Sequence, residues 1–101
     1  MRHAGAQALD RLEPLLQKIR AAGVLKEKSR GCFYLKSKGW LHFHEDPPGL
    51  FADVQGAHGD FDRLEVDEAG ERELLARVAA LKASLSLVGR ERPRSGQGGA
   101  L

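Results

Sequence analysis

Residues 32–55 read CFYLKSKGWLHFHEDPPGLFADVQ, and apolar and polar side chains alternate through them in three short runs. The runs at 32–36, 40–45 and 50–55 have the period of half-buried β-strands. Turn-forming residues separate the runs at 37–39 and 46–49. The segment therefore predicts three consecutive antiparallel strands joined by two hairpins.

The lengths of the two turns predict which residues face each other. We expect residues 37–39 to form a three-residue loop, a type I turn followed by Gly39 in a left-handed bulge position, and residues 46–49 to form a four-residue loop. The first hairpin then pairs Lys36 with Trp40, Leu35 with Leu41, Tyr34 with His42, Phe33 with Phe43 and Cys32 with His44. The second pairs Glu45 with Leu50, His44 with Phe51, Phe43 with Ala52, His42 with Asp53 and Leu41 with Val54.

Directly opposed residues in an antiparallel pair point to the same side, so this register sorts the side chains onto two faces. One face is apolar and suits a core: Phe33, Leu35, Leu41, Phe43, Leu50, Ala52 and Val54. The other, which we call the open face, is predicted to carry Cys32, Tyr34, Trp40, His42, His44, Phe51 and Asp53, with Lys36 at its end beside Trp40. A merely solvated face would be rich in Lys, Glu, Thr and Ser, whereas this one holds half the aromatic residues of the chain and its only cysteine.

Helices are predicted before and after the strands. The first spans residues 11–22 and stops at Gly23. The sequence allows two starts for this helix: an N-cap at Asp10, or a first turn that contains Pro14. The second helix begins after an N-cap at Asp67.

Further strands are predicted at 24–28 and 60–66. The fold class is α+β: an antiparallel β-meander of four to five strands with an N-terminal and a C-terminal helix packed on one face. Residues 1–88 form a single domain. Residues 89–101, rich in Arg, Pro, Ser and Gly, are predicted to be a disordered C-terminal tail.

Composition narrows the class of protein. The chain has 101 residues with 42% hydrophobic and 30% charged residues, which is typical of one globular domain. Its single cysteine excludes an internal disulfide, and no run approaches the ~20 apolar residues that span a bilayer. We therefore expect a cytoplasmic protein that does not act at a membrane.

The histidines suggest one kind of site. His42 and His44 project from the same face of a strand, and Asp53 and Cys32 lie on the flanking strands. This set has the ligand chemistry of a zinc site, although the spacing matches no zinc signature. The alternative is that His42 bonds Asp53 and His44 packs on Phe51, in which case no cofactor is expected.

The same residues bear on catalysis. His42 beside Asp53 has the form of an oriented general base, and the nucleophile would have to be Cys32 or Tyr34, for example Cys32 activated by His44. No glycine-rich loop or helix N-terminus is predicted near them to stabilise an oxyanion. The sequence therefore favours a protein that is not an enzyme.

Binding is the favoured function. Aromatic and histidine side chains suit the centre of a protein interface. We expect Tyr34, Trp40, His42, His44 and Phe51, with Asp53 orienting His42, to contact a protein partner or a second copy of the chain. Nucleic acid is the alternative partner, because the aromatics could stack on bases while nearby lysines meet phosphates.

Residues 33–38, 41–46 and 49–54 together resemble a family of small bacterial proteins with no known activity. The resemblance covers about the middle quarter of the chain. It implies a bacterial, cytoplasmic origin and carries no ligand, activity or functional residue with it.

Overall fold

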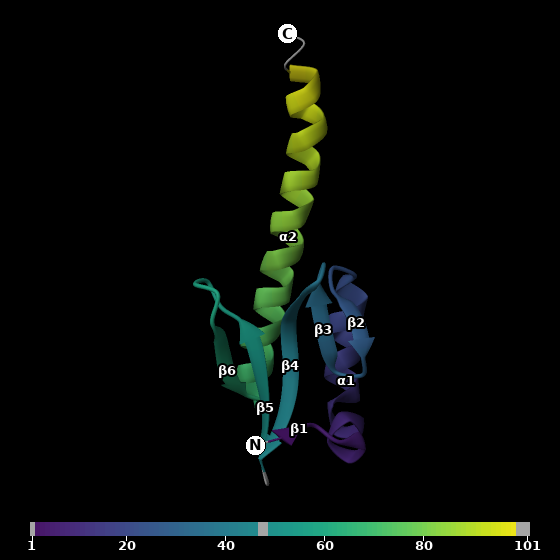
Figure 1. The fold of residues 1–101 in the computed structure, drawn as a ribbon, viewed down its shortest axis with the longest axis vertical. Helices are drawn as coiled ribbons and strands as arrows, with labels where there is room; N and C mark the ends of the chain where they lie inside the picture. Colours follow the sequence, from purple (N-terminus) through teal and green to yellow (C-terminus); the bar gives the residue numbers. More distant parts are fainter. Residues whose placement is uncertain (1, 47–48, 99–101) are drawn as a thin grey trace.

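The computed structural model describes residues 2–46 and 49–98, which form an antiparallel sheet and two helices (Figure 1). The α+β class and the antiparallel meander are therefore confirmed. The elements in chain order are β1 (Arg2–His3), α1 (Ala6–Ala22), β2 (Lys26–Ser29), β3 (Cys32–Leu35), β4 (Lys38–Asp46), β5 (Gly49–Gln55), β6 (Phe61–Glu65) and α2 (Glu68–Gly98).

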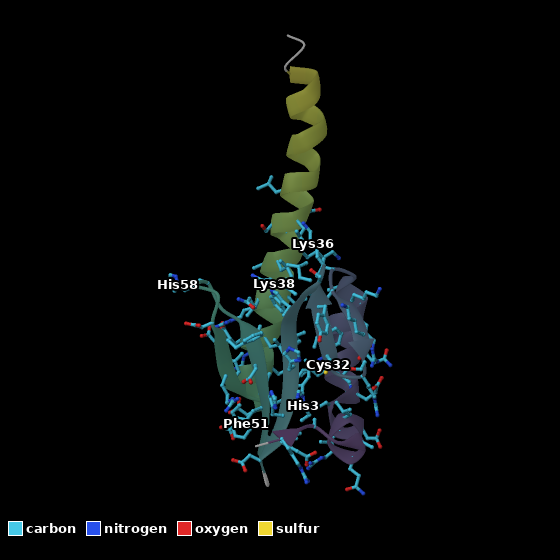
Figure 2. The ribbon with its side chains drawn as sticks, in the orientation of Figure 1. His3, Cys32, Lys36, Lys38, Phe51 and His58 are labelled. Carbon is cyan, nitrogen blue, oxygen red and sulfur yellow. The ribbon has the colours of Figure 1, made fainter. Side chains whose placement is uncertain are left out.

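The five strands β2 to β6 lie in sequence order, and each pairs with the next one along the chain. The short strand β1, which the sequence did not predict, pairs with β4 and places His3 opposite His44. Figure 2 labels His3. The Glu45 carboxylate holds this strand in place, because it accepts a hydrogen bond of 2.6 Å from the Gly5 N–H. That hydrogen bond lowers the pKa of Glu45.

The predicted register of the β4–β5 hairpin is confirmed at every pair. Leu41 faces Val54, and the pairing continues without a break to Asp46 and Gly49. Residues 47–48 of the predicted loop lie outside the described residues.

The predicted register of the β3–β4 hairpin is wrong. Phe33 faces Leu41 and not Phe43, and Leu35 faces Lys38 across a two-residue turn. The left-handed residue in this turn is Lys36, with φ of 58°, and not Gly39. A shift of two residues leaves each side chain on its predicted face, so Cys32 and Phe33 keep their orientation.

Trp40 is the exception, and its predicted place on the open face is wrong. The register shifts between Phe33 and Tyr34, and Trp40 is the extra residue of β4 at that bulge. Its side chain is only 8% exposed and joins the core cluster.

The helix α1 begins at Ala6, earlier than either predicted start, with Gly5 as its N-cap residue. Pro14 consequently lies inside the helix. The predicted end is confirmed, because Gly23 adopts a left-handed conformation with φ of 73° and its N–H donates to the Arg20 carbonyl.

The predicted N-cap of α2 is confirmed, because Asp67 Oδ1 accepts a hydrogen bond of 2.7 Å from the Gly70 N–H. The helix runs past the sheet and projects well beyond it (Figure 1). It continues to Gly98, through most of the segment where a tail is expected to begin at Gly89. The disorder of this tail stays a prediction, and its last residues, 99–101, lie outside the described residues.

One core cluster joins both helices to one face of the sheet. In Figure 1 the sheet lies in front of the two helices. The buried members are Leu12, Leu15, Leu16, Ile19, Phe33, Trp40, Leu41, Phe43, Ala52, Val54, Leu74 and Val78. Within residues 2–46 and 49–98, neither helix is long and apolar enough to cross a bilayer.

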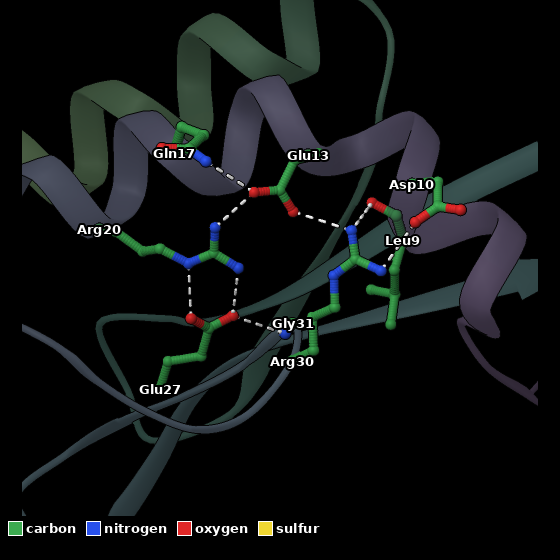
Figure 3. A network of polar contacts seen from close by, with 8 residues as sticks. All are labelled: Leu9, Asp10, Glu13, Gln17, Arg20, Glu27, Arg30 and Gly31. Atoms are coloured by element: carbon green, nitrogen blue, oxygen red, sulfur yellow. Dashed lines mark hydrogen bonds and ion pairs between the residues drawn. The ribbon is translucent and has the colours of Figure 1, made fainter.

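Ion pairs fasten the β2–β3 hairpin to α1 (Figure 3). Arg20 donates to both carboxylate oxygens of Glu27, at 2.6 and 3.0 Å, and also to Glu13 at 2.6 Å. Glu13 accepts a further bond of 2.9 Å from Arg30. These guanidinium groups, Arg30 first, lower the pKa of Glu13 to about 2. The network positions β2 and β3, and with them the open face.

Candidate functional site

The open face holds six of the seven residues predicted for it. Cys32 and Tyr34 come from β3, His42 and His44 from β4, and Phe51 and Asp53 from β5, by the alternation of the observed ladders. All six side chains are half-buried. Among the further residues of this face, which the sequence did not predict, three contact its central side chains: His3, Phe61 and Arg63.

Asp53 is the charged centre of this face. Arg63, directly opposite on β6, donates to its two oxygens at 2.7 and 2.9 Å. Asp53 Oδ2 also lies 3.1 Å from His44 Nε2. The hydrogen bonds from Arg63 are the main reason that the pKa of Asp53 is lowered. The prediction that Asp53 orients His42 is therefore wrong: the two residues are paired in the ladder, but the carboxylate engages Arg63 and His44.

Three imidazoles gather next to this ion pair. The ring centroids of His3 and His44 are 4.8 Å apart, and those of His3 and His42 are 6.3 Å apart. His42 Nδ1 is buried and has no hydrogen-bond partner among the described residues. Burial lowers the pKa of His42, and the neighbouring His3 and His44 lower it further. His42 is therefore held toward its neutral form.

Aromatic rings surround His42 on the remaining sides. Tyr34 and Phe61 contact its ring edge-on, with centroids 6.0 and 5.8 Å away. Phe61 is 45% exposed, which is high for so large an apolar side chain. The Lys28 ammonium lies 4.4 Å above the Tyr34 ring, a cation–π contact. The face thus combines apolar rings with one satisfied ion pair.

Gly39 makes room for this arrangement. A Cβ at that position would lie 2.8 Å from His42 Nε2, closer than side chains tolerate. Gly49 does the same for Phe51, whose ring would lie 2.8 Å from a Cβ there. Both rings therefore lie close to a glycine of the sheet.

The predicted zinc ligands are not arranged as a metal site. Within the described part of the chain, no three His, Cys, Asp or Glu side chains are placed to hold a metal ion. The acidic member, Asp53, is committed to Arg63. Cys32 is a free thiol opposite His42 in the ladder. Zinc binding stays a prediction for His42, His44, Asp53 and Cys32.

Two of the three missed residues had a signal in the sequence. The alternation of residues 61–65 places Leu64 toward the core, and so Phe61 and Arg63 on the opposite face. Extending the hairpin argument through the turn at 56–60 would have found them. His3 had no such signal, because β1 contains only two residues.

Comparison with known proteins adds no family or function. No family model matches the chain, and searches of curated proteins and of solved structures find no match.

Proposed function

We propose that this domain is a non-catalytic binding module that recognises a protein partner through the open face of its sheet. The observation that carries the proposal is the position of Phe61. This ring is 45% exposed and packs on His42 at the centre of a group of aromatic and imidazole rings. Aromatic residues at the middle of a patch, with charged groups around them, are typical of protein interfaces.

The charged groups of the open face favour a protein partner over a nucleic acid. Phosphate binding needs Lys or Arg side chains that are not already neutralised. Arg63, which lies on β6 opposite Asp53, has both carboxylate oxygens of Asp53 as partners. Lys28 lies over Tyr34, on the ring face that a base would stack upon. The open face is therefore better suited to a partner with apolar and hydrogen-bonding groups.

A substitution at the most exposed ring tests this proposal. We expect Phe61→Asp to abolish capture of the specific partner from an extract of the source cells, measured by quantitative mass spectrometry against the unmodified protein. Leu87→Asp is the matched control, because Leu87 is 50% exposed but lies on α2, away from the open face. That variant should capture the same partner at an unchanged level.

The outcomes separate the alternatives. Equal loss with both variants, or no loss with Phe61→Asp, would contradict the proposal. Light scattering of the purified protein distinguishes a second copy from a different partner: a dimer that dissociates in Phe61→Asp alone would identify a homodimer. Binding of a labelled oligonucleotide that weakens steeply with salt would favour the nucleic-acid alternative.

A further inference from the structure

A groove lies at the opposite end of the sheet from His3, where α2 leaves the domain. Its cavity of about 380 Å³ is lined by apolar side chains including Leu35, Trp40 and Leu85, and by Gln55. A second hollow of about 670 Å³ shares Trp40 and Gln55 and continues along α2 past Leu81. None of the aromatic or histidine side chains of the open face lines either hollow.

The apolar stripe of α2 continues from the core into this groove. Leu74, Val78, Leu81 and Leu85 follow one another at spacings of four, three and four residues, the pattern of a helix-pairing seam. Leu74 and Val78 are buried in the domain, whereas Leu85 is 37% exposed. The stripe thus extends beyond the surface that the sheet covers, and it fits a second amphipathic helix laid beside it.

Two lysines stand at the mouth of the groove. Lys36 and Lys38 line it, and Figure 2 labels both at the end of the sheet from which α2 projects. Among the side chains that the structure describes, neither lysine forms an ion pair. By contrast, Arg77 near the second hollow is already paired with Glu73 and Asp62. The uncompensated charge at the groove is therefore positive.

The backbone at Lys36 has a conformation that is unusual for lysine. Its φ of 58° makes it the one non-glycine residue with positive φ among residues 2–46 and 49–98. Glycine or asparagine occupies such positions at less cost. Strained residues are concentrated at ligand-binding sites, where the side chain and not the backbone determines the choice of residue.

We infer that this groove binds an acidic, amphipathic helix of a partner protein. Leucine-like side chains of that helix would pack on Trp40 and Leu85, and its carboxylates would pair with Lys36 and Lys38. A second copy of this chain fits less well, because a two-fold contact centred on the groove would bring the lysines of both copies together.

Selection from a random-peptide display library against the immobilised full chain tests the inference. We expect enrichment of peptides that combine Asp or Glu with Leu or Phe at helical spacing. Because Trp40 is the only tryptophan of the chain, each synthesised peptide should shift its fluorescence emission in a saturable way. The double variant Lys36→Glu/Lys38→Glu should weaken binding by about tenfold or more.

A matched control changes the same amount of charge elsewhere. Arg11→Glu/Lys26→Glu alters two exposed residues of α1 and β2 that do not line the groove, and it should bind the peptides normally. No enrichment, enrichment of basic or neutral peptides, or equal loss in both double variants would overturn the inference. A Trp40 emission shift that depends on protein concentration alone would also overturn the inference, because it would indicate a second copy of the chain. A shift produced by phosphatidylserine vesicles and not by the peptides would overturn it too.

Discussion

His3 and His44 face each other across the β1–β4 ladder, with ring centroids 4.8 Å apart and ring planes tilted by 33°. Two imidazoles can pack this closely while neutral, but two imidazolium ions would repel each other. His42, 6.3 Å from His3, belongs to the same group. The open face should therefore depend on pH through His42, whose pKa is lowered by burial and by these two neighbours.

The stability of the fold should fall on acidification through this range. Burial lowers the pKa of His42 in the folded protein, so the unfolded chain binds more protons between the ordinary value of 6.5 and the folded one. The free energy of unfolding is then at its full value above pH 6.5, and it decreases as the pH falls through this window. Urea denaturation at pH 7.5 and 5.5 measures the decrease, which should be smaller in His42→Gln.

His58→Gln is the control for this experiment, because His58 is exposed in the turn between β5 and β6. It should lose as much stability on acidification as the unmodified protein. An unchanged pH dependence in His42→Gln would show that His42 is not the group responsible.

Zinc should bind weakly to the unmodified protein and more tightly to an Arg63→Ala variant. Asp53 would have to give up its two hydrogen bonds from Arg63 before it could ligate a metal. Isothermal titration with zinc, together with the NMR ring signals of His42 and His44, measures this. Tight binding at unit stoichiometry to the unmodified protein would contradict the expectation, and Arg72→Ala, on the exposed surface of α2, is the control.

Gly70→Ala should destabilise the fold, although alanine normally stabilises a helix relative to glycine. A Cβ at residue 70 would overlap the Glu65 carbonyl oxygen, so β6 and the first turn of α2 would have to separate. We expect a loss of about 1–3 kcal/mol in the free energy of unfolding, measured by urea denaturation. Ala69→Gly, on the exposed side of the same turn, should cost only about 1 kcal/mol, the difference in helix propensity.

Lys36→Gly should raise the free energy of unfolding by about 1 kcal/mol, because glycine adopts the left-handed conformation without strain. The same variant should bind acidic peptides more weakly. Lys38→Gly removes the other lysine but should lower stability, since Lys38 lies in a strand. Stabilisation without loss of peptide binding would show that Lys36 contributes nothing to the groove.

Deletion of residues 89–101 should leave the domain intact, with a free energy of unfolding changed by about 0.5 kcal/mol or less. Among residues 68–87 of α2, whose burial the structure describes, the buried side chains are Leu74 and Val78, near its beginning, and Leu85 is already 37% exposed. Thermal unfolding and the NMR spectrum of the truncated chain check this. Collapse of the core spectrum would place part of the tail within the folded domain.

The two central hairpins differ in how well the sequence predicts them. The β4–β5 register follows from the position of the turn at 46–49 together with alternation, because Phe43 and Ala52 then share one face, and His42 and Asp53 the other. The tip of the β3–β4 hairpin allows two loops, and the structure adopts the one that places Lys36 in a left-handed conformation. The conformational preference of lysine disfavours this loop. The burial of Trp40 favours it, and that burial depends on tertiary packing, which no local sequence pattern contains.

In the candidate site, too, the sequence predicts local relationships better than tertiary ones. Its members on β3, β4 and β5 could be predicted because they are near in sequence and their faces follow from alternation. The partner of Asp53 could not, because His42 and Arg63 lie at nearly equal distances along the chain and both satisfy the same electrostatic requirement. Distance along the chain also hid His3, which reaches β4 through a pairing that spans most of the first half of the chain.

The outermost strands of the sheet limit how this protein can associate. A sheet edge with unpaired backbone groups invites another chain to add a strand, and charged side chains oppose this. β2 reads Lys-Glu-Lys-Ser, and β6 carries Asp62, Arg63 and Glu65. Both edges therefore oppose the addition of strands from other copies of the chain. The surfaces available for contact with other molecules are then the faces of the sheet and the projecting helix.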